Sequence, residues 1–336
     1  MALRTIRWCA GLCLALGLVS SRADAQIVEA VGERALGMGG AFVAVANDSS
    51  ATWWNPGALA AGPFIDVSIV RTMDEQRDAL PARRERVSGF ALTTPPFGFS
   101  FYRLRLAGVP AASAVSGQAG RLEGQPTLPL RAWSASQVGA TLVQTIAPGT
   151  HVGATVKYIR GTFRSGSDAA DLGPSTLLDR AGDLGGGSTE GQFDVDLGAL
   201  ATAGPVRLGA LVRNVRGARF ADGAFELPRQ ARVGVAIAAE QSGGIPLTLS
   251  LDADVRAYRT EAGERRVIAL GAEQWLAGKR LALRGGARFN REGERGRALT
   301  GGGSVSLRTG TFLDAHIVRG GSPDERGWGV AARVSF

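Results

Sequence analysis

The last nine residues of the chain read Trp328-Gly329-Val330-Ala331-Ala332-Arg333-Val334-Ser335-Phe336. Successive side chains of a β-strand point to opposite faces, so one face of this stretch is wholly apolar and ends on two aromatic residues, Trp328 and Phe336. The other face carries only small or polar side chains. A buried strand of a soluble sandwich shows the same alternation, so these residues alone leave that alternative open.

The other end of the chain carries an export signal. Arg4 and Arg7 precede an apolar run from Trp8 to Val19, which is too short to cross a bilayer as a helix, and Ala23-Asp24-Ala25 forms a small-x-small cleavage site. We therefore expect residues 1–25 to be a removed signal peptide. In an exported protein, an aromatic-ended final strand is typical of the signal that directs the assembly of outer-membrane β-barrels. The residues that we expect to carry this assembly signal are Trp328, Val330, Val334 and Phe336.

Composition excludes several classes of function. Removal of the signal peptide leaves 336 − 25 = 311 residues, and both cysteines, Cys9 and Cys13, leave with it, so disulfides and thiolate metal sites are excluded. The formal charge of +8 becomes 35 − 29 = +6, with the arginines scattered singly, which argues against nucleic acid as a partner. His151 and His316 are the only histidines, and we expect neither a metal nor a cofactor.

From Phe64 onward the chain repeats a unit of about ten alternating apolar and polar residues, followed by a break rich in Gly, Pro, Asp or Arg. This repeat predicts an all-β, up-and-down transmembrane barrel of about 14 antiparallel strands over residues 63–336. The expected strands lie near residues 64–72, 86–94, 97–105, 132–146, 151–163, 191–202, 206–216, 229–239, 246–257, 265–276, 280–290, 298–308, 311–319 and 327–336.

The expected connections alternate in length. Tight turns lie at 94–96, 147–150, 203–205, 277–279 and 309–310. Longer connections lie at 73–85, 106–131, 164–190, 217–228, 258–264, 291–297 and 320–326. Short periplasmic turns opposite longer extracellular loops are typical of outer-membrane barrels. We therefore expect the chain in the outer membrane of a Gram-negative-type bacterium, in contact with outer-membrane lipid and with the barrel-assembly machinery.

The two faces of the expected strands differ in chemistry. In the stretch 246–257, Leu247, Leu249 and Leu251 alternate with charged or hydroxyl side chains, which suits a lipid-facing wall around a polar lumen. A solvated face of a soluble sheet fits each strand equally well, and only the export signal, the final strand and the loop order together favour the membrane. Paired carboxylates in this pattern need no catalytic role, and we expect no enzyme. The charged residues expected to face the lumen are Asp194, Asp196, Asp252, Asp254, Arg256, Arg284, Arg288 and Arg333.

The segment before the first strand does not have a strand pattern. It contains Gly32-Glu33-Arg34-Ala35-Leu36-Gly37-Met38-Gly39-Gly40-Ala41, then Asp48 among small residues, then Asn55-Pro56-Gly57. This order resembles the N-terminal hatch of the FadL-type outer-membrane family, which comprises long-chain fatty acid and hydrocarbon transporters and their PorV-like relatives. Members show Gly-x-Arg-Ala-x-Gly-x-Gly-x-Ala, then an Asp, then Asn-Pro-Ala. Here the last motif ends in Gly57, and Asn47 stands before Asp48 where many members carry two acids.

The resemblance implies a barrel whose lumen is plugged by a hatch of residues 26–62. In the transporter branch, a hydrophobic ligand enters among the extracellular loops, reaches a site beside the hatch and leaves sideways through a gap in the wall. In the PorV-like branch, the barrel is a platform for secretion-system components and transports nothing. The loops 106–131 and 164–190 lack the Phe and Leu clusters expected of a fatty-acid receptor. We therefore expect a channel for small hydrophobic molecules that is gated by the hatch, with the PorV-like platform as the alternative. The hatch or gating residues implied are Arg34, Gly37, Gly39, Gly40, Asp48, Asn55 and Pro56.

Overall fold

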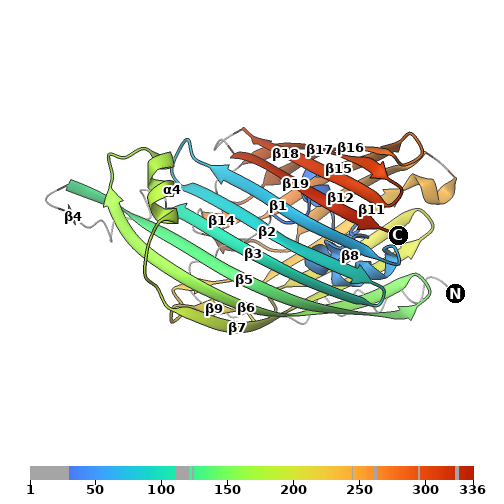
Figure 1. The fold of residues 1–336 in the computed structure, drawn as a ribbon, viewed down its shortest axis with the longest axis horizontal. Helices are drawn as coiled ribbons and strands as arrows, with labels where there is room; N and C mark the ends of the chain where they lie inside the picture. The colour runs from blue at the N-terminus through green and yellow to red at the C-terminus, as the bar shows by residue number, and fades with distance from the viewer. Residues whose placement is uncertain are drawn as a thin grey trace.

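The computed structural model describes residues 30–110, 121–122, 125–243, 245–260, 263–293, 296–321 and 325–336. The expected signal peptide lies outside these ranges. Fourteen long strands form a closed antiparallel barrel with a strong tilt (Figure 1). They are β1 Asp66–Gln76, β2 Ala82–Thr94, β3 Phe97–Val109, β5 Gln125–Ala147, β6 Thr150–Ala169, β7 Thr189–Ala203, β8 Val206–Arg213, β11 Gln230–Ala238, β12 Leu247–Asp254, β15 Val267–Leu276, β16 Leu281–Asn290, β17 Arg297–Arg308, β18 Thr311–Gly320 and β19 Glu325–Ser335.

Each long strand pairs with its neighbours in chain order, and the first strand closes the barrel against the last. The β1–β19 register runs from Asp66 opposite Ser335 to Gln76 opposite Glu325. The remaining strands are short extensions in the connections. They are β4 Arg121–Leu122, β9 Arg219–Phe220, β10 Phe225–Glu226, β13 Tyr258–Thr260 and β14 Gly263–Arg265. The expected up-and-down barrel of fourteen strands is confirmed.

Alternate residues of the strands separate an apolar outer face from a polar inner face. On β19, Trp328 and Val330 are 45% and 48% exposed, whereas Arg333 on the opposite face is buried. Large apolar side chains are exposed in the same way around the barrel, among them Ile69, Phe99 and Leu142. Because apolar surface of this extent is unfavourable in water, this outer face suits the hydrocarbon of a bilayer.

The two ends of the barrel differ as expected, although several connections depart from their expected bounds. Two-residue connections such as 148–149 and 309–310 lie at one end, whereas the connections 170–188 and 214–229 lie at the other. The long connection expected at 73–85 is wrong. Strand β1 continues to Gln76 and β2 begins at Ala82, so only residues 77–81 connect them. At the end with the tight turns, the connection 239–246 is longer than its neighbours and contains the short helix η3 Ala239–Ser242.

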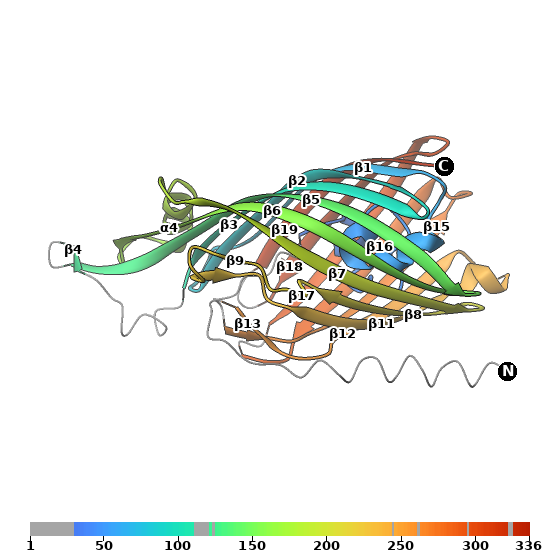
Figure 2. The same cartoon turned by 90° about the horizontal axis from the view of Figure 1, so that it is seen from below.

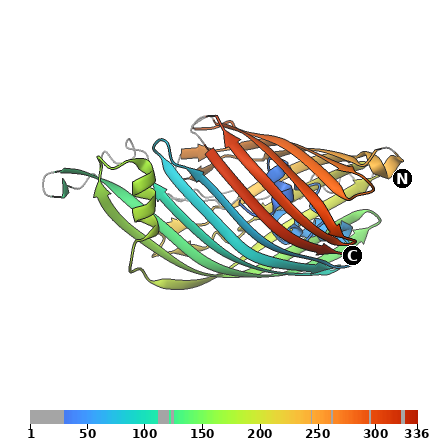
Figure 3. The same ribbon diagram turned by 45° about the horizontal axis from the view of Figure 1, so that its top comes forward.

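A helix that the sequence analysis did not foresee covers part of the outer wall. Helix α4, Pro174–Gly182, begins with proline in its first turn and buries Leu177, Leu178 and Ala181. These residues pack against outward-facing residues of β2, β3 and β5, and Figure 3 shows α4 on the outside of these strands. Over the described residues, no helix combines the length and the hydrophobicity that crossing a membrane requires.

The described N-terminal residues fill the lumen at the end with the tight turns. We call residues 30–62 the lumenal segment. It contains α2 Glu33–Gly37, α3 Ala51–Trp54 and the 3-10 helix η1 Pro56–Ala61, and almost all of its residues are buried. Figure 2 shows these elements enclosed by the strands. Helix α2 contacts β16 to β19 and η1 contacts β5, β6 and β7, so the segment reaches across the barrel.

Candidate functional site

Arg34 is the main charged contact between the lumenal segment and the wall. Its guanidinium donates to both carboxylate oxygens of Glu273 on β15, at 2.9 and 2.7 Å, and to Asp48 at 2.8 Å and Asn47 at 2.9 Å. Burial alone raises the pKa of Asp48, but the neighbouring Arg34 outweighs it and holds that pKa below its ordinary value. Asp48 is therefore charged beside Arg34 in this buried site, while the bidentate partner of Arg34 is Glu273.

The contact continues as a chain of alternating charges along the wall. Arg284 donates to Glu273 at 2.6 Å and lies 3.8 Å from Asp314. Arg333 donates to Asp314 at 2.9 Å and to Asp66 at 3.3 Å. Asp66 in turn accepts the backbone N–H of Ser49 in the lumenal segment at 2.9 Å. The chain therefore starts and ends on the lumenal segment, and we call it the charge ring.

The Asn55-Pro56 turn ties the segment to β7 on the other side of the lumen. The Asn55 side chain donates to the carbonyls of Val43 and Ala199, at 2.7 and 2.8 Å, and accepts from Gly57 N–H at 3.0 Å. A Cβ on Gly57 would lie 2.8 Å from the Ala199 Cα atom. Glycine in place of the usual alanine of the motif thus allows a close approach between this turn and the wall.

Glycines on both sides allow the segment and the wall to touch through their backbones. Gly39 has φ +70°, and a Cβ there would lie 2.9 Å from Leu270 O, while Gly40 has φ +82°. Gly37 faces Gly302 of β17, where a Cβ would lie 3.3 Å from the Gly302 Cα atom. Six wall glycines likewise leave no room for a side chain against the segment, and they are Gly153, Gly198, Gly209, Gly271, Gly286 and Gly302.

The charged residues expected in the lumen fall into two groups. Asp252, Arg284 and Arg333 bind the lumenal segment directly or through the charge ring, since Asp252 accepts Phe42 N–H and Val43 N–H, both at 2.8 Å. The remaining charged residues instead bind residues of the wall strands and connections. Asp254 accepts from Arg232 and Tyr258, both at 2.8 Å, Arg288 contacts Glu325 and Asp74, and Arg256 donates to Arg229 O at 2.8 Å.

Asp194 and Asp196 mark the point where β8 leaves the wall. Asn214, directly after β8, has φ 55°, and its N–H donates to Asp196 at 2.8 Å. Asp194 accepts the N–H groups of Arg216 and Ala218 at 2.9 and 3.0 Å. These carboxylates therefore hold the chain that leads into the connection 214–229, which folds over the lumen.

Four aromatic rings pack together inside the barrel, on the side of the lumenal segment nearer the long loops. Trp133 of β5 stacks on Phe225 of the β9–β10 hairpin with ring centroids 4.8 Å apart and meets Phe220 edge-on at 5.8 Å. Phe163 of β6 stacks on the other side of Phe225 at 5.7 Å. The same buried apolar cluster continues through Ile159 and Leu104 to the tryptophans of the lumenal segment. We call these four rings the aromatic cluster.

The residues expected to carry the assembly signal lie on the outer face of β19. Val334 and Phe336 are 37% and 64% exposed, in line with Trp328 and Val330 on the same face. The backbone of Phe336 exchanges two hydrogen bonds with Ile65, at 2.9 and 3.0 Å. The last residue is therefore bonded to the segment that leads into the first strand.

The sequence analysis missed the residues of the wall that meet the lumenal segment. Glu273 and Asp314 each occupy an inward position of a predicted strand, but nothing in the sequence links Glu273 to Arg34, which is 239 residues away. Arg213 and Trp53 were also missed, although the Arg213 guanidinium lies 4.7 Å from the Trp53 ring centroid and donates to Trp53 O at 2.8 Å. The paired Trp53-Trp54 next to Asn55 was the available signal.

Comparison with known proteins supports the fold. No family model matches the chain, and no curated protein matches its sequence. Among solved structures, the toluene transporter TbuX of Ralstonia pickettii is similar at a TM-score of 0.61 and 16% identity, covering 92% of this chain and 99% of its own. The monoaromatic hydrocarbon channel CymD is similar at a TM-score of 0.62 and 13% identity, and the match covers 91% of this chain and 98% of CymD. The toluene transporter TodX of P. putida is similar at a TM-score of 0.56 and 14% identity, and the match covers 92% of this chain and 99% of TodX.

The closed wall, its apolar outer face and the buried N-terminal segment define a plugged, fourteen-stranded transmembrane β-barrel. Its fold is that of the FadL-type outer-membrane barrels, over nearly the whole length of the similar structures.

Proposed function

We propose that the protein is a gated channel for small hydrophobic molecules in the outer membrane of a Gram-negative-type bacterium. The observation that carries this proposal is the lumenal segment, which fills a barrel with the fold of aromatic hydrocarbon channels. In this proposal the lumenal segment is the described part of the hatch expected over residues 26–62, and residues 26–29 lie outside the described residues.

The aromatic cluster supports a small and apolar ligand. It lies in the lumen between the loops and the lumenal segment and joins both through one continuous apolar cluster. Phe220 and Phe225 belong to a short hairpin between β8 and β11, whereas Trp133 and Phe163 are fixed in long wall strands. A flat hydrophobic molecule could take the place of the hairpin rings between the two wall rings, and would keep the stacking contacts that this arrangement now makes.

The contacts of the lumenal segment support a gate that moves without unfolding the barrel. Its bonds to the wall run through a few side chains, chiefly Arg34, Asp48, Asn55 and Asp252, and through glycine contacts. The wall strands are bonded to each other and do not depend on the segment for their backbone hydrogen bonds. In the proposed cycle, ligand binding displaces the segment, and Arg34, Gly37, Gly39, Gly40, Asp48, Asn55 and Pro56 set the strength of closure.

One observation favours the alternative, a PorV-like platform that binds secretion-system components and transports nothing. Strand β3 pairs without a register shift with β2 and with β5 along its whole length. The register shifts within the wall occur beside the tight turns, at Thr145/Ala147 and Ser306/Arg308. Away from the tight turns, the described wall strands therefore pair without a break in register, and release of a ligand sideways into the membrane requires a rearrangement.

Uptake of labelled toluene separates the two functions. Cells that express the protein in a background of low hydrocarbon permeability should take up toluene faster than vector controls. Phe225→Ala, in the aromatic cluster, should change the rate several-fold, whereas Phe193→Ala, which is 57% exposed on the outer face, should leave it unchanged. Folded, heat-modifiable protein with uptake equal to the vector control would contradict the channel. Loss of surface-protein export in a deletion strain would then favour the platform.

A further inference from the structure

The outer face of the wall carries a group of exposed arginines on β1, β2, β3 and β6. They point away from the lumen, because the residues that alternate with them along these strands face inward. Ser68 on β1 and Gly153 on β6, for example, contact the lumenal segment. Their guanidinium groups lie on the half of the wall nearer the long loops. We call this group the arginine belt, and it consists of Arg71, Arg86, Arg103, Arg105 and Arg160.

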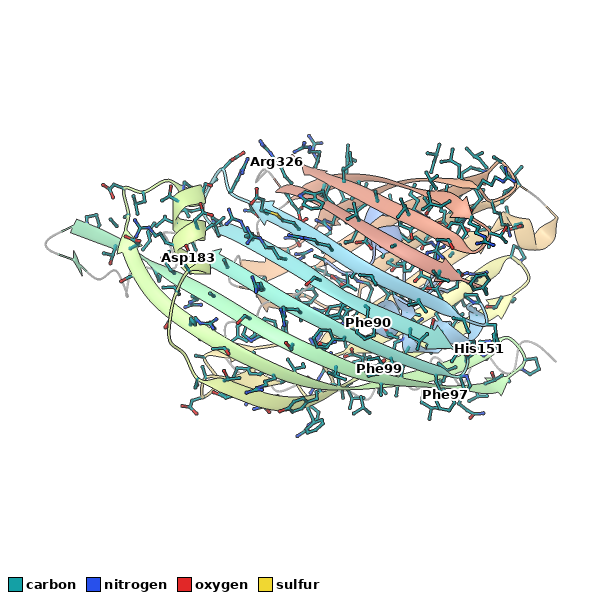
Figure 4. The ribbon with its side chains drawn as sticks, viewed as in Figure 1. Phe90, Phe97, Phe99, His151, Asp183 and Arg326 are labelled. Atoms are coloured by element: carbon teal, nitrogen blue, oxygen red, sulfur yellow. The ribbon has the colours of Figure 1, made fainter. Side chains whose placement is uncertain are left out.

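The strand register places the belt directly against the edge of the apolar face. One row across five strands is Ile69, Phe90, Phe101, Val138 and Tyr158. The next outward-facing row toward the loops is Arg71, Ser88, Arg103, Ser136 and Arg160. Two residues along a strand span about 6.8 Å, so the change from apolar to cationic takes place within a single step. Figure 4 shows Phe90, Phe97 and Phe99 toward the end with His151, and Asp183 at the opposite end beside α4.

Protein carboxylates do not neutralise the belt. Within the described part of the chain, none of its five side chains has a hydrogen bond or an ion pair to another residue, whereas the neighbouring Arg84 is paired with Glu75 at 3.0 Å and Asp179 at 2.6 Å. Arg86 also stands directly opposite Arg105 in the β2–β3 register. Like charges opposite each other destabilise a strand pair, so this arrangement needs an anion from outside the chain.

Two cavities lie over the belt. One of about 760 Å³ is lined by Arg86, Arg103, Arg105 and Arg160. It is bounded toward the loops by Leu178 and Asp179 of α4 and by Asp183, directly after that helix. A second, of about 510 Å³, is lined by Arg71, Arg86, Arg103, Arg105 and Trp328. Arginines on alternate strands stand about 10 Å apart, at twice the strand spacing. One headgroup with more than one phosphate could therefore contact several of them.

We propose that the arginine belt binds the phosphate groups of an anionic glycolipid of the outer leaflet, with its acyl chains on the apolar row below. Guanidinium groups bind phosphate through paired, charge-assisted hydrogen bonds. A free phosphate has no use for the adjoining apolar row, and a soluble acidic protein could not reach side chains at the edge of the hydrocarbon. The inference rests on the proposed placement of the barrel in an outer membrane, but not on transport of any molecule.

The test compares lipid binding by two charge-matched variants of the full, folded protein. The first is Arg86→Gln/Arg103→Gln/Arg105→Gln. The second removes three exposed basic residues at the end of the barrel with the tight turns, as Lys279→Gln/Arg280→Gln/Arg308→Gln. The ligands are bisphosphorylated lipid A, the same lipid after enzymatic removal of its phosphates, and inorganic phosphate, with the bound fraction measured by native mass spectrometry from a zwitterionic detergent. Heat-modifiable gel mobility reports folding.

Each basic residue near an anionic lipid surface contributes about fivefold to affinity, so the belt variant should bind lipid A about 100-fold more weakly than the wild type. The control variant should stay within about twofold of the wild type. If the triple variant does not fold, Arg103→Gln and Arg105→Gln separately should each lose about fivefold. Equal binding by the belt variant, equal binding of the dephosphorylated lipid, or inorganic phosphate binding as tightly as lipid A would each overturn the proposal. Toluene uptake is independent of these outcomes.

Discussion

The wall glycine Gly286 offers the sharpest test of how the lumenal segment is held. A Cβ at this position would lie 2.3 Å from Gly39 N and from the Met38 carbonyl carbon. The next residue, Gly285, faces the opposite side of the same strand, and a Cβ there meets nothing within 4 Å. Gly286→Ala and Gly285→Ala therefore make the same chemical change on the two faces of β16, and only the first affects the contact with the segment.

The size of the effect follows from the overlap. Ordinary contacts of a Cβ begin at 3.4 Å, so the backbone at Met38 and Gly39 must move by 3.4 − 2.3 = 1.1 Å. Overpacking of this kind costs about 1–3 kcal/mol, which is roughly a 5- to 150-fold rise in the fraction of molecules with an undocked segment. The nearby bond from Thr300 Oγ1 to Gly37 O, at 2.9 Å, should weaken as well.

Two measurements check this expectation. Limited proteolysis of the purified barrel should cleave the segment faster in Gly286→Ala, and single-channel recordings should show larger or more frequent openings. Gly285→Ala should behave as the wild type in both, and both variants should keep heat-modifiable mobility. Equal proteolysis and conductance of the two variants would refute the claim that backbone contact with the wall holds the segment in place.

Three further predictions concern titration, assembly and topology. Burial raises the pKa of Glu33 to about 8, whereas an exposed glutamate in the undocked segment has a pKa near 4.3. Between these pH values only the docked segment keeps the proton on Glu33, so docking should weaken as the pH rises from about 4.3 to about 8. Glu33→Gln should remove this dependence from a pH series of limited proteolysis, and an unchanged profile would contradict it. Phe336→Asp should yield exported but unassembled protein, seen as loss of heat-modifiable mobility, and a normal folded yield would argue against the assembly signal. In intact cells, a thiol label should reach cysteines introduced at Gly173 or Gly223 and miss those at Pro148 or Gly278, whereas equal labelling would refute the proposed orientation.

The wall of the barrel could be predicted from the sequence because its pattern is local. Alternation such as that of Leu247, Leu249 and Leu251 with polar neighbours depends only on the period of a strand, and all fourteen strands were found. Strand ends were not predicted as well, because β2, β3, β5 and β6 extend four to seven residues beyond their expected bounds. At the start of β2, Arg83, Arg84 and Glu85 have the composition of a loop, although they continue the strand.

The contacts inside the lumen could not be predicted, because they depend on how far each strand is shifted against the next. The motif with Arg34 and Asn55 indicated a hatch, but its partners Glu273 and Ala199 follow only from the three-dimensional register. Helix α4 was missed for a different reason. Its buried face is only Leu177, Leu178 and Ala181, too short a pattern to distinguish from a loop rich in small residues.

The charge ring joins the lumenal segment to the seam of the barrel, where the first strand meets the last. Arg333 belongs to β19 and Asp66 to β1, and Asp66 also accepts Ser49 N–H from the segment. Closing the seam and docking the segment therefore strengthen each other, and by reciprocity whatever withdraws the segment also weakens the seam. A molecule that opens this lumen would thus also loosen the wall along the seam that makes the sheet a closed tube.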